Sequence, residues 1–265
     1  MNSGRRLLAT LAGIVSIAVT AAHPATALSG DTASTVTRTE VTFSNSNTGQ
    51  VIGRGYYQIS RSRSSQTIIG ENRYLDGERD EEVDSLNLSE SGDLTLETYN
   101  HKFLNADGSP QSIDMLDVKT GIAACTSYSG DEQRVREVKL VVPQDTYAGS
   151  AQLALLSRRL KQGEREIAMH SFICFPGPRI VAIKATPVAQ TSWTARPGKL
   201  LNLTISLDLG WLTRLTDRFI PTASGLFDPD DDFSYVGGTF DRFYRRRHVT
   251  MLCSRRPDFS VPLER

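Results

Sequence analysis

The stretch LNLTISLDL, Leu201 to Leu209, decides the fold of this chain. Aliphatic side chains occupy its odd-numbered positions and polar side chains its even-numbered ones. Successive side chains of a β-strand point to opposite faces of a sheet, so this period of two predicts a strand with one dry and one wet face. The fold that follows is a sheet with one face buried against other parts of the chain.

The same alternation, in weaker form, recurs through the first half of the chain. Expected strands there cover residues 35–44, 49–60, 65–74, 81–89, 93–103, 111–118, 122–127 and 133–142. Turn residues separate them, as at Ser91-Gly92-Asp93 and Ser129-Gly130-Asp131. Connections this short join antiparallel neighbours, because parallel strands need a crossover of about a dozen residues or more. The region up to residue 142 is therefore predicted to be an antiparallel meander.

The hydrophobic period changes in DTYAGSAQLALLSRRLKQ, residues 145–162, which predicts a helix. An acidic residue stands at its start, basic residues fill its last turns and Gly163 follows, as expected of helix ends. A shorter amphipathic helix is expected over 210–220, ended by Pro221. Its apolar side is formed by Trp211, Leu212, Leu215 and Phe219.

Further strands are expected at 166–175, 179–186, 188–194, 199–209, 233–243 and 248–253. No linker, low-complexity segment or repeat divides the chain. We predict a mainly β (α+β) fold in a single domain: a curled antiparallel sheet or half-barrel, with one long and one short helix packed on its concave side. A β-sandwich with a helical insertion is the alternative.

The N-terminus has the layout of a secretory signal peptide. Arg5 and Arg6 precede an uncharged apolar run, residues 7–22, which is short for a membrane span. The small residues Ala25-Thr26-Ala27 follow, and we expect cleavage after Ala27. The mature domain would then be residues 28–265, exported to the periplasm or secreted. An uncleaved N-terminal anchor is the alternative.

Charge and cysteine content narrow the function classes. The chain has 30 basic and 30 acidic residues among its 265, and its pI is near 6.9. This balance argues against a nucleic-acid partner, which needs a positive field. Three cysteines, Cys125, Cys174 and Cys253, allow one internal disulfide in an oxidising compartment. Which pair forms is left open, and all three can equally be buried thiols.

Three short motifs carry a resemblance to a known group of proteins. They are VIGRGYYQIS (Val51 to Ser60), DTYAGS (Asp145 to Ser150), and FDPDDDF (Phe227 to Phe233) followed by Val236-Gly237-Gly238. Over residues 35–255 the chain resembles exported bacterial domains of unknown function. More distantly it is similar to the periplasmic lipoprotein carriers, whose half-barrel holds acyl chains beneath helices. The resemblance implies the fold, export and, by analogy, a lipid ligand, and it carries no catalytic residues.

Motifs of known catalytic chemistry are missing from the sequence. It has no Gly-x-Ser-x-Gly, His-Glu-x-x-His, Cys-x-x-Cys or phosphate-binding glycine loop. Ser150 stands at a helix entry, where a serine caps or packs. His101, His170 and His248 are interpreted as structural. We therefore predict no enzyme activity and no cofactor.

Two acidic clusters are candidate sites. Asp228, Asp230, Asp231 and Asp232 offer the oxygen ligands that Ca²⁺ prefers, but they lack the ligand spacing of an EF-hand loop, so a turn is the favoured interpretation and no metal is expected. The second cluster is interpreted as a solvated strand edge that resists pairing with other edges. It comprises Glu78, Asp80, Glu81, Glu82 and Asp84.

A basic run near the C-terminus offers a docking surface. Its arginines are Arg242, Arg245, Arg246 and Arg247, with Phe240, Phe243 and Tyr244 among them. Guanidinium groups pair with phosphate, so anionic headgroups of a membrane surface are possible partners. A solvated hairpin balanced by residues 228–232 is the alternative interpretation.

Two functions remain open. The first is a non-enzymatic carrier that binds a lipid or acyl group between sheet and helices, with Trp211, Leu212, Leu215 and Phe219 as a lid. The second is a structural or protein-interaction component of the cell envelope that uses the arginine run. The first predicts lipid that copurifies with the protein, and the second predicts partner binding that weakens with salt.

The leader can be tested by expressing residues 1–265 in an exporting bacterial host. Mass spectrometry of the purified chain should give an N-terminus at Leu28, because signal peptidase cleaves after small residues. An intact N-terminus on a membrane-bound product would show the anchor instead.

Overall fold

The computed structural model describes residues 35–130, 132–174, 176–191, 200–208, 223–240 and 248–253. The chain divides into two units, residues 1–31 and 32–265; the first lies outside the described residues, and the fold below is that of the second. Its first eight strands are β1 (Thr35–Asn45), β2 (Val51–Arg61), β3 (Ser65–Tyr74), β4 (Arg79–Leu88), β5 (Leu94–Leu104), β6 (Pro110–Asp117), β7 (Ile122–Ser129) and β8 (Glu132–Lys139). The later elements are β9 (Thr146–Tyr147), α1 (Ala151–Lys161), β10 (Ile167–Ile173), β11 (Arg179–Thr191), β12 (Leu200–Leu207), β13 (Ala223–Asp228), β14 (Ser234–Phe240) and β15 (Val249–Cys253).

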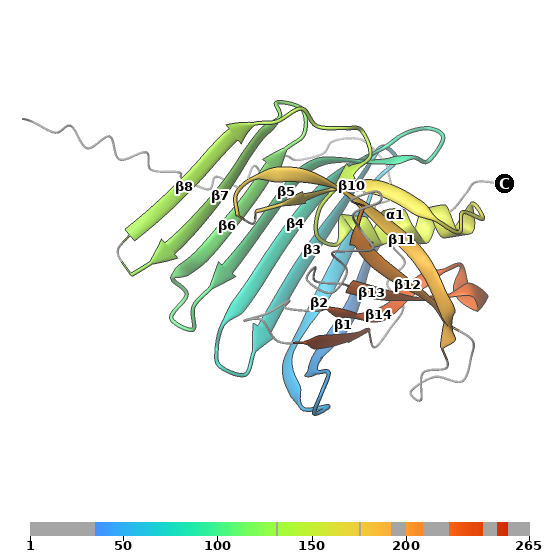
Figure 1. Cartoon of the computed structure of the whole chain (residues 1–265), viewed down its shortest axis with the longest axis horizontal. Helices are drawn as coiled ribbons and strands as arrows, with labels where there is room; N and C mark the ends of the chain where they lie inside the picture. The colour runs from blue at the N-terminus through green and yellow to red at the C-terminus, as the bar shows by residue number, and fades with distance from the viewer. Residues whose placement is uncertain are drawn as a thin grey trace, which may run out of the picture. The chain divides into compact units, whose positions relative to one another are not determined.

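All fifteen described strands belong to one sheet, in the order β8-β7-β6-β5-β4-β3-β2-β1-β15-β14-β13-β12-β11-β10-β9. Figure 1 shows the consecutive strands from β2 to β8 side by side. Neighbours are antiparallel except β9 and β10. The predicted meander is therefore confirmed, and the β-sandwich alternative is wrong because there is a single sheet.

The order of the strands forces the sheet to curl. The two edge strands, β8 and β9, follow one another in the chain with only residues 140–145 between them. Such a link spans at most about 25 Å when fully extended. A flat sheet of fifteen strands, spaced about 4.8 Å apart, would separate its edges by more than twice that distance. The two edges must therefore face one another across an open seam.

Side chains hold the seam where no backbone ladder does. A disulfide joins Cys125 on β7 to Cys174 at the end of β10. The rings of Tyr99 on β5 and Phe172 on β10 meet edge to face, 6.0 Å between centroids. The Tyr147 hydroxyl donates to the carbonyl of Leu94, and Arg136 of β8 donates to the carbonyl of Pro176. Of the cysteine alternatives, the Cys125–Cys174 pair forms, and Cys253 is a buried thiol.

Helix α1 ties together strands that are distant in the sheet. Gln152 donates to Ser171 of β10, and Arg158 reaches Asp93 and the carbonyl of Ser91 in the β4–β5 turn. Its far end is bound to the β13–β14 turn, where Ser157 donates to the carbonyl of Phe233 and Lys161 pairs with Asp232 at 3.1 Å. The apolar side of α1 belongs to the main core. Within the described residues, no helix is long and apolar enough to span a membrane.

The structure corrects three predicted boundaries. The helix begins at Ala151 and not at Asp145, because Thr146 and Tyr147 pair with β10 and Asp145 binds His170 at 2.7 Å. Residues 179–186 and 188–194 were expected as two strands, yet β11 runs through Pro187 with an irregular register after Val188. Strand β13 was missed, since its Ser-Gly sequence resembles a turn. The short helix expected over 210–220 lies outside the described residues.

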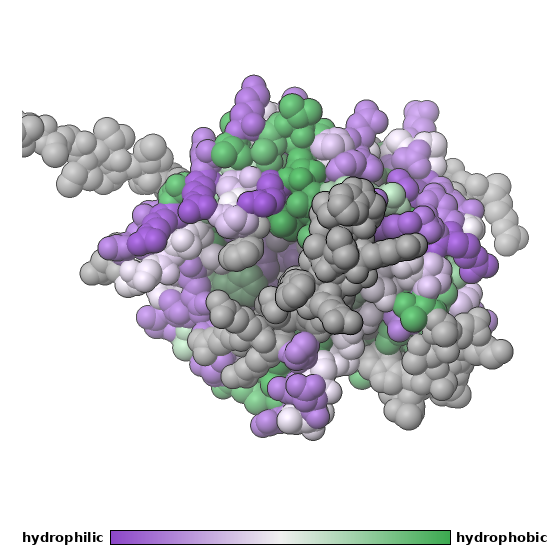
Figure 2. All heavy atoms as spheres, in the orientation of Figure 1, coloured by the Kyte–Doolittle hydropathy of each residue, from purple (hydrophilic) through white to green (hydrophobic). Residues whose placement is uncertain are grey.

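The free edge strand β8 is exposed at every position. Its sequence EQRVREVK places charged side chains on both faces. Figure 2 shows this end of the sheet as largely hydrophilic. Charges on an open edge oppose pairing with other strands, so the sequence of β8 disfavours association through this edge.

The disulfide should contribute strongly to stability, because it closes the seam across 49 residues of sequence. The chain-entropy relation gives about 4 kcal/mol for a loop of this length. Urea unfolding of the double variant Cys125→Ser/Cys174→Ser should show a free energy of unfolding lower by about that amount. Equal stability of variant and wild type would mean that the other seam contacts suffice.

Candidate functional site

The acidic stretch of β4 is buried, which contradicts its interpretation as a solvated strand edge. Strand β4 lies inside the sheet between β3 and β5. Asp80, Glu82 and Asp84 alternate along it and are 2%, 8% and 0% exposed. Their side chains share the inner face, defined here as the face that carries the core residues Leu86 and Leu116. Glu81 and Val83 point to the opposite, outer face.

Strand register extends this polar line across the sheet. Glu82 lies opposite His101 of β5, His101 opposite Asp114 of β6, and Asp114 opposite Cys125 of β7. Directly opposed residues on adjacent strands are in side-chain contact range. We call Glu82, His101, Asp114 and Cys125 the inner row. It places three ionisable groups and one disulfide sulfur on the face that also carries the core leucines.

The start of helix α1 rests on this acidic face. Backbone N–H groups of Ser150 and Ala151 donate to Glu82 Oε1 at 2.6 Å and to Asp84 Oδ2 at 2.9 Å. The helix N-cap, Ser150, makes no side-chain cap bond of its own. The first N–H groups of a helix lack internal partners and attract negative charge. Two carboxyl groups from β4 therefore cap a helix that begins about seventy residues later in the chain.

Gly149 makes this approach possible. Its φ is +46°, and a Cβ there would lie 2.6 Å from the Glu82 carboxyl group. A larger residue would displace the carboxylate from the helix start. Glycine in the DTYAGS motif is thus required by a contact that is far away in sequence.

Burial and neighbouring charges shift the pKa values of Asp84 and His101 on this face. Burial, the nearby charge of Glu82 and a hydrogen bond shared with it together raise the pKa of Asp84 well above its usual range. Burial and the neighbouring like charge therefore favour the protonated form of Asp84. Burial alone would lower the pKa of His101, but Asp80, with its carboxylate 3.3 Å away, and the charges of Glu82 and Asp114 outweigh burial and raise that pKa to about 9.

These groups serve structure better than chemistry. His101 is charged at neutral pH and so cannot act as a general base there. The described side chains around it are carboxylates, tyrosines and Phe103, and include no activated hydroxyl or thiolate. The acidic face therefore holds the start of α1 in place.

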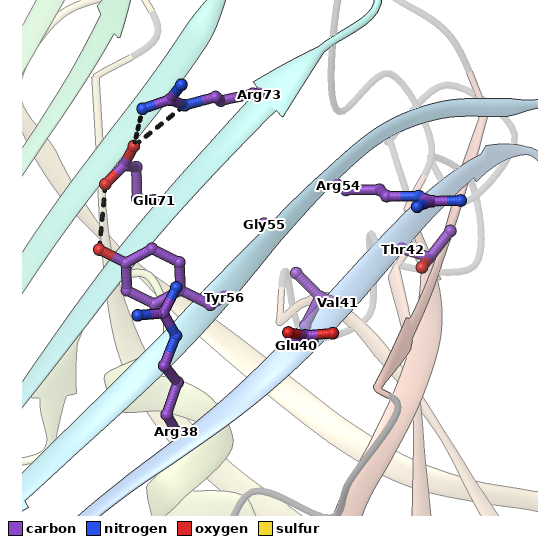
Figure 3. Close-up of a pocket in the computed structure, with 9 residues that line it drawn as sticks. All are labelled: Arg38, Glu40, Val41, Thr42, Arg54, Gly55, Tyr56, Glu71 and Arg73. Atoms are coloured by element: carbon purple, nitrogen blue, oxygen red, sulfur yellow. Dashed lines mark hydrogen bonds and ion pairs between the residues drawn. The ribbon is translucent and has the colours of Figure 1, made fainter.

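A groove of about 580 Å³ lies on the outer face over β1, β2 and β3. Figure 3 shows its lining side chains on the two sides of Gly55. Gly55 must lack a side chain, because a Cβ would lie 2.0 Å from Asn72 Oδ1 and 2.3 Å from the Glu71 carbonyl oxygen. The lining residues are Arg38, Glu40, Val41, Thr42, Arg54, Gly55, Tyr56, Glu71 and Arg73. A groove of this size can take a small molecule or a headgroup.

One wall of the groove is a connected polar network. Arg73 donates twice to Glu71 Oε1, at 2.9 and 3.2 Å, and the Tyr56 hydroxyl donates to Oε2 at 3.0 Å. These bonds, led by that of Arg73, lower the pKa of Glu71, and the bond to Glu71 raises the pKa of Tyr56. The guanidinium carbon of Arg38 lies 3.7 Å from the centre of the Tyr56 ring. The ring is thereby fixed between a cation and a carboxylate.

Two cations of the groove have no acidic partner in the described part of the chain. Arg38 stacks on the Tyr56 ring, and neither Arg38 nor Arg54 makes a hydrogen bond or an ion pair with a described residue. Arg54 points away from Arg73 across the groove, toward Thr42 (Figure 3). Unpaired guanidinium groups around a hollow suit an anion, because they present paired N–H donors to carboxylate or phosphate.

Comparison with known proteins gives a similarity at the level of structure only. No known protein family matches the sequence, and no curated protein matches it. Among solved structures, the chain is similar to a crystal structure from Brucella abortus described as a beta-barrel-like protein of domain of unknown function DUF1849. The two share 11% identity, with a TM-score of 0.45 over 83% of this chain and 95% of the other.

Most residues predicted to form sites lie outside the described residues. These are the lid residues Trp211, Leu212, Leu215 and Phe219 and the docking residues Arg242, Arg245, Arg246 and Arg247. The turn interpretation of residues 228–232 is supported by internal bonds. Asp228 caps the turn by accepting from Asp230 N–H, Asp231 accepts from Ser234, and Asp232 pairs with Lys161.

Sequence reasoning missed both sites described above. The signal for the inner face was the alternation of Asp80, Glu82 and Asp84, but Glu81 on the opposite face hid it. The signal for the groove was the outward-facing set Arg38, Glu40, Arg54 and Tyr56, which reads in sequence as an ordinary wet face. The interpretation of the histidines as structural residues fits His101, which pairs with Asp80.

His101 should make stability depend on pH. Its pKa rises from 6.5 to about 9 on folding, so its contribution is complete below pH 6.5 and is lost as pH rises through 9. Between these values wild type should lose up to about 3 kcal/mol of unfolding free energy. In urea titrations from pH 6 to 10, His101→Gln and Asp80→Asn should both flatten this decline. An unchanged slope in both variants would contradict the assignment.

Proposed function

We propose that this is an exported, non-enzymatic binding protein that holds a phosphate-bearing ligand in its outer groove. The observation that carries the proposal is the pair of guanidinium groups, Arg38 and Arg54, that line the groove without an acidic partner among the residues that the structure describes. A charged hydrogen bond of this kind contributes about 1.5–3 kcal/mol. Thr42 adds a hydroxyl donor on the side of Arg54.

Export is supported by two independent features. Residues 1–27 have the charge and hydropathy pattern of a cleaved leader. The Cys125–Cys174 disulfide suits an oxidising compartment, since cytosolic proteins keep their thiols reduced. A periplasmic or secreted location also supplies phosphate-bearing ligands, because envelope lipids present such groups at their surface.

The sequence favoured a ligand held through its acyl chain, whereas the geometry favours recognition of a headgroup. An acyl site needs an apolar wall. The described inner face instead carries Asp80, Glu82 and His101 at its centre. We therefore propose that the protein meets an anionic lipid through its phosphate, with the groove as the contact.

Vesicle binding tests this proposal. The mature chain should cosediment with vesicles of anionic phospholipid more strongly than with vesicles of zwitterionic phosphatidylcholine, and less so in high salt. Arg54→Ala and Arg38→Ala should each weaken binding about 10- to 100-fold. Arg63→Ala is the matched control, because Arg63 is an exposed arginine of the β2–β3 turn outside the groove.

Binding experiments with inorganic phosphate and glycerol phosphate distinguish a soluble phosphate ligand from the phosphate of a lipid headgroup. Binding of these soluble compounds, measured by calorimetry and lost in Arg54→Ala, would identify a soluble phosphate ligand. Competition of glycerol phosphate with vesicles would identify a lipid headgroup. If Arg63→Ala and Arg54→Ala lost vesicle binding equally, the net charge of the protein would explain the binding. The proposal that the groove binds the phosphate would then be wrong.

A further inference from the structure

A second cluster of reactive groups lies at the seam. Asp114 of β6, Cys125 of β7 and Cys174 beyond β10 bring one carboxylate oxygen and two sulfur atoms within 4.8 Å of one another. Strand pairing fixes Asp114 directly opposite Cys125. The disulfide fixes Cys174 against both. The cluster therefore joins three segments that come from the two sides of the open sheet.

The Asp114 carboxyl group has a charged neighbour in the oxidised structure but no bonded partner among the described residues. It makes no hydrogen bond or ion pair with any described residue, although it is partly buried. A carboxylate removed from water without a partner is costly. Its neighbours are the two neutral sulfur atoms and, directly opposite on β5, the ring of His101, whose charge attracts the carboxylate without a hydrogen bond. This position would gain a partner if a cation were bound between the carboxylate and the sulfurs.

We propose that the Cys125–Cys174 disulfide is the oxidised form of a Zn²⁺ site completed by Asp114. A small dithiol transfers two electrons and two protons to the disulfide, giving two cysteine thiols and the cyclic disulfide of the reductant. Zn²⁺ then binds both sulfurs as thiolates and releases their two protons, and the Asp114 carboxylate is the third ligand. A water molecule takes the fourth position.

The geometry fits this exchange with small movements. Tetrahedral Zn²⁺ with Zn–S bonds of about 2.3 Å separates its two sulfurs by about 3.8 Å. The Cα atoms of the two cysteines are already 5.6 Å apart, so rotation of the side chains provides the separation. Two thiolates and one carboxylate leave the zinc centre with one net negative charge. Arg136, opposite Cys125 on β8, supplies a positive charge beside it.

The site would preserve the seam in both redox states. With the disulfide reduced, Zn²⁺ would link β6 and β7 to the end of β10 through its ligands. The protein could then bind zinc only after reduction, so metal binding would report the redox state of its surroundings.

Zinc titration of the full chain tests the proposal. Protein reduced with a dithiol and freed of it under argon is titrated with Zn²⁺ against a chromogenic chelator, beside the oxidised protein. The reduced wild type should bind one Zn²⁺ per chain that the oxidised protein does not bind. Reduced Asp114→Ala should bind at least about tenfold more weakly, since one of three protein ligands is lost. Cys253→Ala is the thiol control and should bind like wild type.

Circular dichroism before and after reduction shows whether the reduced chain remains folded. Zinc bound by unfolded thiols would not depend on Asp114, so equal affinity in wild type and Asp114→Ala overturns the proposal. Equal zinc affinity of the reduced and the oxidised wild type, measured against the chelator, overturns it as well. Asp114→Ala keeps both cysteines, so this comparison holds even if Cys125→Ser or Cys174→Ser fails to fold.

Discussion

The six-residue connection between β8 and β9 constrains the whole structure. These strands are neighbours in the chain but occupy the two edges of a fifteen-stranded sheet. Only a curled sheet brings its edges close enough for so short a link. The curl in turn encloses the inner face, receives α1 and creates the seam where the disulfide and the ring contact between Tyr99 and Phe172 lie.

The curled sheet carries charge where a simple core would be apolar. Helix α1 accounts for much of this charge, because its unpaired N–H groups need acceptors and Glu82 and Asp84 supply them. Two like charges buried together repel one another, and the raised pKa of Asp84 favours the protonated form that relieves this repulsion. The charge of Asp80 is balanced by His101. The acidic residues of β4 thus bind the start of α1 to the sheet. Gly149 allows the Glu82 carboxyl group to approach the helix.

The sequence predicted strands well where alternation was clean and turns were short. Ser65–Tyr74 coincides with β3, and the other strands of the meander begin within two residues of the expected positions. Prediction failed where a contact distant in sequence decides the outcome. Periodicity could not place Asp84 inside, because the partner that makes its burial tolerable, the N–H group of Ala151, belongs to a helix 67 residues later. The groove was hidden for a related reason, since Arg38, Arg54 and Glu71 come together only through strand register.

The pairing of β1 with β15 has a topological consequence. These are the first and last described strands, and they lie side by side in the middle of the sheet, with Val41 opposite Cys253. Read from β9 through β15 and on from β1 to β8, every strand is followed by its spatial neighbour. In spatial order the strands therefore form one continuous series, and the chain is interrupted between β15 and β1 in the middle of the sheet. A circular permutant that opened the polypeptide between β8 and β9 and joined the ends of β15 and β1 would keep every ladder intact, leaving closure of the sheet to side chains alone.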